Sequence, residues 1–349
     1  MFEYKASKKE EARARVEEYM DSMPQFITSY VMSVERIISP LSLRLYLQRI
    51  DVFFHYLQEN NENFKGKDIK EFTVADLGNL KRLDIENFIH HLFYHGAAKK
   101  EKNTRTTTTN NYICALNSLY RFLFEEEYIN ANPLAKVRRS PAKRDKEIIR
   151  LKRNETRKLL STVENGTGLS KRQNASREKT ELRDLCILVI LLKTGIRVSE
   201  LVGLDLDDVN LQECSLRILR KREKADKIFF DDEVAGYIRE YLETRKEDYQ
   251  PTDDEQALFL VSIGTYKGCR LSVRSVENLV KKYADAGVPE KLGIISPHKL
   301  RATFATALSK KEDLASVQDA LGHADPKTTR MYVDSTSREK KRNDTLNIY

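Results

Sequence analysis

The stretch Ser296-Pro297-His298-Lys299-Leu300-Arg301 predicts the start of a helix that carries polar chemistry on one face. Ser296 can cap this helix, and Pro297 suits its first position, where a missing N–H costs nothing. His298 and Arg301 are three residues apart and therefore share a face. Apolar residues recur at helical spacing on another face: Leu300, Phe304, Ala307 and Leu308. We expect the helix to bury its apolar face and to aim His298 and Arg301 at something outside the core.

A second helix is predicted over residues 313–321. It ends at Gly322, a residue suited to the left-handed conformation that closes a helix. His323 then lies just past the helix terminus, on a turn that the backbone fixes. Asp325-Pro326 begins a further helical segment, and Tyr332 lies on it.

Earlier in the chain, residues 185–192 form an apolar run that predicts a buried helix. Gly195 stops this helix and leaves Arg197 on a tight turn before the next short helix. The backbone therefore places the guanidinium of Arg197. Glu200 follows three residues later, and we expect it to orient the arginine and a histidine rather than to do chemistry itself.

Between these two regions, residues 215–219 and 227–230 predict two strands joined by the charged segment 220–226. A lysine at the tip of such a hairpin can reach into a partner's groove. Lys221 is the best placed candidate by sequence, and Lys224 is a second one.

These residue types suit attack on a phosphodiester. Planar guanidinium groups such as those of Arg197 and Arg301 can hold its non-bridging oxygens with paired, charge-assisted hydrogen bonds. Removing one such donor typically costs about 3 kcal/mol of transition-state stabilisation. His323 could hydrogen-bond the same phosphate.

The remaining groups cover bond breaking and proton transfer. The phenol of Tyr332 can form a covalent phosphoryl link that keeps the bond energy for rejoining, so that no ATP is needed. Lys221 can protonate the leaving 5' oxygen. His298 is a candidate proton shuttle because its unperturbed pKa lies near neutrality.

Taken together, this constellation resembles the tyrosine recombinase, or phage integrase, family. The matching stretches are Thr194-Gly195-Ile196-Arg197-Val198-Ser199-Glu200-Leu201, then residues 296–306, Leu321-Gly322-His323 and Tyr332. The resemblance implies that Tyr332 is the nucleophile, that Glu200 is a supporting residue, and that the catalytic site contains Arg197, Lys221, His298, Arg301 and His323. The family often has glycines beside the hairpin lysine, where this chain has Arg220 and Arg222. Ala302 likewise replaces a histidine common in the family.

Further features resemble the Xer-like recombinases of Firmicutes, in which one protein acts alone at a chromosomal site. They are the Met23-Pro24 opening, the insert 164–181 and the segment Ala257-Leu258-Phe259-Leu260. Integrases of mobile elements share much of this layout. The choice between a chromosomal resolver and a mobile-element integrase therefore stays open.

Composition agrees with a polyanionic partner. The chain has 349 residues, enough for two domains, with 61 Lys and Arg against 53 Asp and Glu, a net charge of +8. Its four cysteines have no CxxC spacing and its six histidines show no metal spacing, so we expect free thiols, no metal and no cofactor. No apolar run approaches the roughly 20 residues of a membrane span. We therefore expect a cytoplasmic, nucleoid-associated protein without membrane contact.

The fold class expected is mainly α with a small antiparallel β-sheet (α+β). Residues 1–137 contain helical patterns at 10–20, 42–59, 82–94 and 108–126, and they resemble the family's all-α core-binding domain. Residues 138–150 are basic and proline-broken, which indicates an interdomain linker. Residues 151–334 form the expected catalytic domain, and the resemblance implies that the tail 335–349 docks on a neighbouring protomer.

Contacts to DNA are expected from three places. The lysine- and threonine-rich segment 99–110 lies ahead of a predicted helix and would present backbone N–H groups and hydroxyls to phosphate. The linker would cross the duplex, and the hairpin would reach it. The candidate residues are Lys99, Lys100, Lys102, Arg105, Thr106, Thr108, Arg139, Lys143 and Lys224.

The leading hypothesis is a site-specific recombinase that acts on double-stranded DNA sites as a homotetramer, with tail exchange and an accessory or directionality protein as a further partner. A type IB topoisomerase-like enzyme would share the chemistry without pairing two sites. A DNA-binding regulator with the same fold but no catalysis would predict a damaged site. The covalent protein–DNA product distinguishes the enzymes from the regulator.

Overall fold

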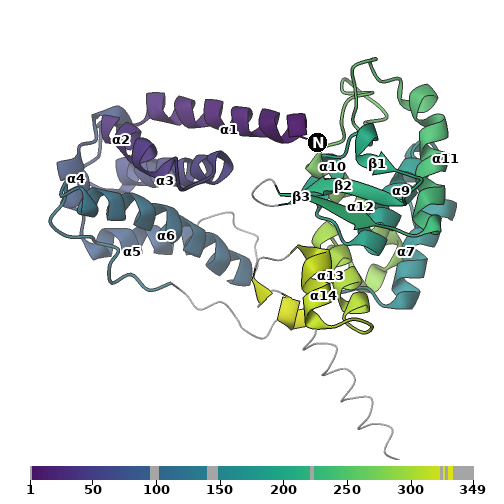
Figure 1. Ribbon diagram of the computed structural model, residues 1–349. Coiled ribbons are helices and arrows are strands. Elements are labelled where there is room, and N and C mark those ends of the chain that lie inside the picture. The colour runs from purple at the N-terminus through teal and green to yellow at the C-terminus, as the bar shows by residue number, and fades with distance from the viewer. Residues whose placement is uncertain are drawn as a thin grey trace, which may run out of the picture. The chain divides into compact units, whose positions relative to one another are not determined.

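The computed structural model describes residues 2–94, 102–139, 148–220, 224–322, 325–326 and 329–332. As the sequence predicts, the fold is mainly helical with one small antiparallel sheet. The chain forms two compact units (Figure 1). Residues 3–146 make up the N-terminal unit, and residues 147–349 with residues 1 and 2 make up the C-terminal unit.

The described part of the N-terminal unit is helical throughout. Its elements are α1 (Phe2–Ser22), α2 (Gln25–Val34), α3 (Pro40–Asn60), the 3-10 turn η1 (Ile69–Glu71), α4 (Val74–Gly78), α5 (Arg82–Tyr94) and α6 (Lys102–Glu125). The four helices predicted in this region are all present, with α1, α3 and α6 longer than the patterns indicated.

Helix α3 shows why this unit folds. The Ser39 side chain caps it by accepting a hydrogen bond from the Ser42 N–H, and Pro40 occupies its first turn. One face is then buried at helical spacing: Leu43, Leu47, Ile50, Phe53, Phe54 and Leu57. This face packs on α6, where the hydroxyl of the fully buried Tyr120 donates to the Leu77 carbonyl at 3.2 Å. The unit therefore has a core of its own.

Helix α6 begins at Lys102, earlier than the predicted start at residue 108. The expectation that segment 99–110 offers unpaired backbone N–H groups ahead of a helix is therefore wrong for Thr106 and Thr108. Both lie inside α6, where N–H groups beyond the first turn bond to carbonyls four residues earlier. The Thr108 side chain is exposed, so a contact through its hydroxyl is compatible with the helix.

The C-terminal unit is built around a three-stranded sheet and a buried helix. The strands β1 (Val209–Asn210), β2 (Ser215–Leu219) and β3 (Ala225–Phe229) are antiparallel in that order, with Leu216 paired to Ile228. Short 3-10 turns lie at η2 (Leu206–Asp208) and η4 (Pro289–Lys291). The helices are α7 (Arg153–Asn165), α8 (Lys171–Glu178), α9 (Glu181–Thr194), α10 (Val198–Val202), α11 (Asp232–Tyr249), α12 (Val273–Gly287), α13 (Pro297–Leu308) and α14 (Leu314–Leu321).

Helix α9 is the centre of this unit. Every residue from 183 to 191 is buried, which matches the apolar run in the sequence. Helices α7, α11 and α13 all pack against it (Figure 1). A helix buried on all sides is held in one position, so the turn at its carboxyl end is a rigid starting point for the site.

Candidate active site

Gly195 closes α9 and directs the chain into the site. Its φ of +61° is left-handed, as the sequence predicts for a helix stop. A Cβ added at this position would lie 2.2 Å from Cδ1 of Phe304 on α13. A glycine is therefore required both by the backbone conformation and by the close approach of α13.

Two residues later, Arg197 and Glu200 hold each other at the start of α10. Arg197 is the N-cap residue, and the Glu200 carboxylate accepts its backbone N–H at 2.7 Å and its Nη1 at 2.8 Å. The Glu200 side chain is 3% exposed, whereas that of Arg197 is 34% exposed. The carboxylate is thus a buried anchor, and the guanidinium is oriented but still reachable from solvent.

Arg301 lies on α13, and its guanidinium links two helix ends. Nη1 donates to the carbonyl of Gly195 after α9, and Nη2 donates to the carbonyl of Leu321 at the end of α14. The residue is 4% exposed. The expectation that Arg301 aims away from the core is therefore wrong. The terminal carbonyls of two packed helices lack intrahelical partners, and a buried guanidinium supplies the missing donors.

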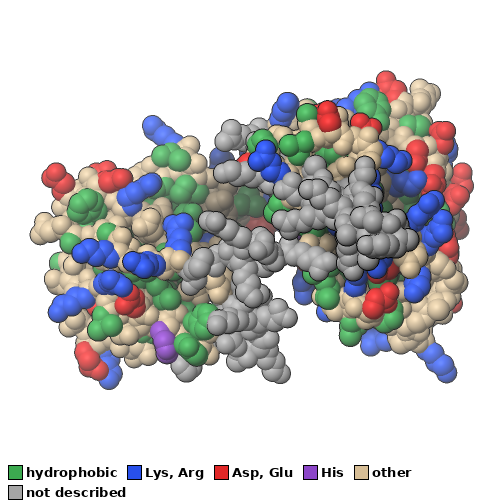
Figure 2. All heavy atoms as spheres, turned by 90° about the horizontal axis from the view of Figure 1, so that it is seen from below, with side chains coloured by type: hydrophobic (Ala, Val, Ile, Leu, Met, Phe, Trp, Pro, Cys, Tyr) green, Lys and Arg blue, Asp and Glu red, His purple; other side chains and the backbone are tan. Residues whose placement is uncertain are grey.

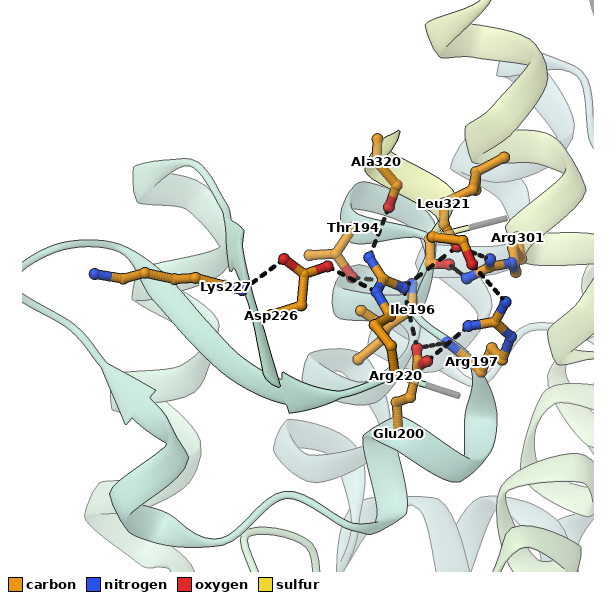
Figure 3. Close-up of polar contacts among 12 residues, drawn as sticks. Thr194, Ile196, Arg197, Glu200, Arg220, Asp226, Lys227, Arg301, Ala320 and Leu321 are labelled. Atoms are coloured by element: carbon orange, nitrogen blue, oxygen red, sulfur yellow. Dashed lines mark hydrogen bonds and ion pairs between the residues drawn. The ribbon is translucent and has the colours of Figure 1, made fainter. Parts of the chain in front are cut away.

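The carboxyl end of α14 collects three guanidinium groups (Figure 3). Arg301 donates to Leu321, Arg197 Nη2 donates to Gly322 at 3.2 Å, and Arg220 Nη2 donates to Ala320 at 2.9 Å. Gly322 itself has a left-handed φ of +56°, as predicted. Cations at a helix carboxyl end are favoured by the partial negative charge there.

Arg220 is the residue of this cluster that sequence reasoning missed. It follows β2, is 6% exposed, and pairs with Asp226 at 2.8 Å and Glu200 at 3.5 Å. One signal could have found it. Leu216 and Ile218 face inward at a spacing of two, and Arg220 continues that face.

The electrostatics of the cluster favour an anion. Arg197, Arg220 and Arg301 surround one buried carboxylate, Glu200. Burial, together with the cations of Arg197 and Arg220, lowers the pKa of Arg301 to about 10. Arg301 therefore remains charged at neutral pH. Because guanidinium groups bind phosphate through paired hydrogen bonds, the cluster can take a phosphodiester.

His298 lies on the first turn of α13 and is exposed, as its predicted position on a polar face indicated. Partial burial of the imidazole, helped by the cations of Lys299 and Arg301, lowers its pKa below the ordinary value. The lowered pKa favours the neutral ring, which has a nitrogen that can accept a proton.

Tyr332 is 4% exposed and packs in a small apolar cluster made by α13 and α14. The cluster consists of Ala302, Ala305, Val317, Leu321 and Tyr332. Burial raises the pKa of the phenol, and the positive charge of Arg301 opposes that rise. Tyr332 and Arg301 therefore interact electrostatically.

Several predicted residues cannot be placed. Lys221, His323, Lys99, Lys100 and Lys143 lie outside the described residues, as do the side chains of Lys102 and Arg105. Lys224 is described and exposed. Its carbonyl accepts the Arg220 N–H at 2.8 Å, at the loop end of the β2–β3 hairpin. Arg139 is exposed.

Two further findings concern metals and membranes. Among the described residues, no group of three His, Cys, Asp or Glu side chains is placed to hold a metal ion. Within the same part of the chain, none of the helices combines the length and the apolar character that a membrane crossing requires.

Comparison with known proteins now defines the class. Residues 149–339 match the Phage integrase family, and residues 27–127 match the Phage integrase, N-terminal SAM-like domain. The first match covers more than half of the chain and includes the whole arginine cluster. The fold and the family match are those of an enzyme of site-specific recombination.

Relatives along the whole length agree. The Tyrosine recombinase XerS of Streptococcus thermophilus (strain CNRZ 1066) is 32% identical, over 96% of this chain and 98% of the relative. That of Streptococcus equi subsp. zooepidemicus (strain MGCS10565) is 32% identical, over 94% of this chain and 96% of the relative. The chain belongs to the phage integrase family and is a tyrosine recombinase of the Xer-like kind.

Solved structures show the same fold. The XerH site-specific recombinase bound to palindromic difH substrate, in its post-cleavage complex, aligns with a TM-score of 0.60 at 22% identity, over 88% of this chain and 79% of that one. The Tn1549 transposon integrase in complex with transposon right end DNA aligns with a TM-score of 0.64 at 19% identity, over 92% and 98%.

Proposed function

We propose that this recombinase cuts and rejoins double-stranded DNA at specific sites through a 3'-phosphotyrosine link and a Holliday junction. The observation that carries the proposal is the guanidinium cluster: Arg197, Arg220 and Arg301 lie around the buried carboxylate of Glu200. The phenol of Tyr332 interacts electrostatically with Arg301. A site with excess positive charge beside a tyrosine suits phosphoryl transfer to a phenol oxygen.

In the proposed cleavage step, the phenol oxygen of Tyr332 attacks the scissile phosphorus. A bond forms between phosphorus and the tyrosine oxygen, and the bond to the 5' oxygen breaks. His298, whose lowered pKa favours the neutral ring, accepts the phenol proton. Lys221, with Lys224 as the second candidate, gives a proton to the 5' oxygen. Rejoining is the reverse reaction with a 5' hydroxyl as nucleophile, so no cofactor is needed.

The arginines act on the phosphate rather than on the protons. Arg197 and Arg301 bind the non-bridging oxygens, whose charge is greatest in the transition state. Glu200 holds Arg197 in place through two short hydrogen bonds. His323, which directly follows Gly322, is proposed as a further hydrogen-bond donor to the same phosphate.

The proposed organisation assigns DNA binding to both units. Residues 1–137 act as the core-binding domain, 138–150 as the linker, 151–334 as the catalytic domain and 335–349 as the tail that docks on a neighbouring protomer in a homotetramer. The solved relatives in complex with DNA support duplex DNA as the partner. The role would be exercised at the nucleoid, with an accessory or directionality protein where the direction of exchange is controlled.

Likeness to XerS proteins along almost the full chain favours the Xer-like role, in which one recombinase acts alone at a chromosomal site. Covalent capture tests this proposal. Cells of the native host are lysed directly into denaturant, and DNA attached to the protein is recovered and sequenced. Attachment at one chromosomal locus supports the resolver role, and attachment at the ends of an element identifies an integrase.

The matched variants are Tyr332→Phe and Tyr266→Phe. Tyr332→Phe should abolish covalent attachment while leaving DNA binding intact, because only the phenol oxygen is lost. Tyr266 is 72% exposed, so Tyr266→Phe should attach as the unaltered protein does. Attachment that survives Tyr332→Phe refutes this nucleophile, and no attachment by the unaltered protein favours a non-catalytic DNA-binding regulator.

A further inference from the structure

Arg220 is a buried charged residue to which the proposed chemistry assigns no role. Its guanidinium contacts three different elements: Asp226 on β3, Glu200 on α10, and the carbonyls of Ala320 and Leu321 on α14. Figure 3 shows Arg220 between these groups. A side chain that is 6% exposed and joins three elements fixes their relative positions.

The donors of Arg220 are committed to the protein. Nε donates to Asp226, Nη1 to Glu200 and Leu321, and Nη2 to Ala320. A guanidinium has five N–H donors, so little remains for a substrate. Arg197, by comparison, is 34% exposed and accessible to a phosphate. The structure therefore separates an arginine that can bind substrate from one that binds protein.

The position of Arg220 in the chain gives these contacts their meaning. Its backbone N–H donates to the Lys224 carbonyl at 2.8 Å, so Arg220 and Lys224 lie where the two strands meet the loop of the hairpin, and Lys221 follows Arg220 in the sequence. The carbonyls that its side chain binds directly precede Gly322 and His323. One guanidinium thus ties the strand before the proposed general acid to the helix before a proposed phosphate ligand.

Packing at Gly322 supports a close fit. A Cβ at position 322 would lie 2.7 Å from Nε and 2.9 Å from Cζ of Arg220. The glycine thus leaves room for the guanidinium as well as adopting the left-handed turn. The guanidinium of Arg220 also lies near those of Arg197 and Arg301, and like charges repel. Its presence there therefore has an electrostatic cost.

We propose that Arg220 is a positioning residue, which ties the hairpin carrying the catalytic lysine to Glu200 and to the carboxyl end of α14. The inference rests on the proposed function, because it assumes that the hairpin lysine protonates the 5' oxygen. Arg220 acts through that lysine and does not touch the DNA. The same Glu200 carboxylate then aligns the phosphate-binding Arg197 and the acid-bearing hairpin.

The test compares two leaving groups on the DNA site recovered by covalent capture. One duplex has an ordinary scissile phosphate, and the other has sulfur in place of the bridging 5' oxygen. A thiolate leaves without a proton, so loss of general acid matters only for the ordinary duplex. The variants are Arg220→Gln, Lys221→Ala, Lys224→Ala and, as a matched control, Arg217→Gln on the same hairpin, where Arg217 is 57% exposed.

Arg220→Gln should cleave the ordinary duplex about a hundredfold more slowly, since a displacement of about 1 Å can cost that much. On the sulfur duplex, the cleavage rate of Arg220→Gln should be within a few-fold of the rate of the unaltered protein. The same should hold for the variant that lacks the general-acid lysine. Arg217→Gln should be unaffected on both duplexes. An equal loss on the two duplexes, or no loss on either, overturns the positioning role.

The outcomes keep the two proposals apart. If the unaltered protein forms no adduct on either duplex, the proposed function fails. If sulfur restores cleavage by neither lysine variant, the proposal that a hairpin lysine protonates the 5' oxygen is refuted. If a lysine variant is rescued and Arg220→Gln is not, only the present inference fails.

A second measurement needs no DNA and also covers poor folding. Amide hydrogen exchange in Arg220→Gln should be faster than in the unaltered protein in peptides spanning 219–225 and 319–324, and unchanged in α9. If Arg220→Gln does not fold, Asp226→Asn removes the negative charge of the group that accepts from Nε, at a site where the side chain is 37% exposed. This variant should give the same pattern with smaller changes. Unchanged exchange in both peptides contradicts the proposal.

Discussion

The guanidinium of Arg301 has two tasks at once: it satisfies the ends of α9 and α14, and it is proposed to hold a phosphate oxygen. A lysine could keep the charge but not the fork that reaches both carbonyls, because an ammonium is a point donor on a flexible stem. Replacing the guanidinium should therefore weaken both the hydrogen bonds to the helix ends and the proposed binding of phosphate.

Arg301→Lys should lower the free energy of unfolding by about 2 kcal/mol, the usual worth of hydrogen bonds to a charged group. It should also slow formation of the covalent adduct about a hundredfold. Urea unfolding and single-turnover cleavage measure the two effects. Arg274→Lys is the control, because Arg274 is 80% exposed. A variant with unchanged stability would show that these carbonyl contacts contribute nothing.

His298 should make the protein sensitive to mild acid. Its folded-state pKa is lowered by burial and by Lys299 and Arg301, so the unfolded chain takes up a proton before the folded one does. The pKa of histidine in the unfolded chain is about 6.5. The stabilisation is present above this pH, and it is lost as the pH falls toward the lower pKa of the folded state.

Urea unfolding between pH 7.5 and 5.5 covers roughly the range around the pKa of histidine in the unfolded chain. Over this range, the free energy of unfolding of His298→Gln should fall less than that of the unaltered protein. An NMR titration of the His298 ring should show a midpoint below the ordinary value, and a short DNA duplex should raise it by adding a phosphate. A midpoint at or above the ordinary value in the DNA-free protein would contradict the lowered pKa.

At the residue scale, the sequence predicted that Arg197, Glu200 and Arg301 lie near one another but not how each is held. The turn at Gly195 predicted the placement of Arg197 and Glu200, because local rules of helix ending apply there. The helix at Ser296 was predicted correctly, but the burial of Arg301 on it was not. Arg220 was missed because its partners, apart from the nearby Asp226, lie in α10 and α14, far from it in the chain. Periodicity within a strand reveals an inward direction, not the partner that it meets.

At the scale of elements, the approach of α9 and α13 depends on Gly195. Gly195→Ala should cost roughly 2–5 kcal/mol, from the left-handed backbone and from overpacking against Phe304. Gly236→Ala is the matched control: it lies inside α11 with no atom within 4 Å of an added Cβ, and it should gain about 0.5–1 kcal/mol in helix stability. Thermal and urea unfolding measure both, and equal effects would refute the steric role of Gly195.

Helix boundaries were the less predictable part of the elements. The predicted helix at 313–321 corresponds to α14, where the Asp313 side chain caps by accepting the Ser316 N–H at 2.8 Å. Helix α6 began earlier than predicted because threonines, which favour caps and turns in isolation, are carried in the helix by its packed downstream face. Tertiary packing, which no local window contains, decides such cases.

At the scale of the whole molecule, net charge alone does not locate the site. Basic and acidic side chains are interspersed on the face of each unit seen in Figure 2, so the excess of +8 is not one broad field on that face. The positive charge to which we assign a role in the chemistry is the cluster of Arg197, Arg220 and Arg301. The affinity of the two units for DNA should therefore depend on their covalent connection as much as on surface charge.

This dependence can be measured by dividing the chain. Because each unit has its own buried core, fragments 1–146 and 147–349 should each unfold cooperatively in urea. Joining two binding units makes the second contact intramolecular, so an equimolar mixture of the fragments should bind the recovered DNA site at least about a hundredfold more weakly than the intact chain. Fluorescence anisotropy at fixed salt gives the comparison. A mixture that binds as tightly as the intact chain would show that one unit supplies the affinity by itself.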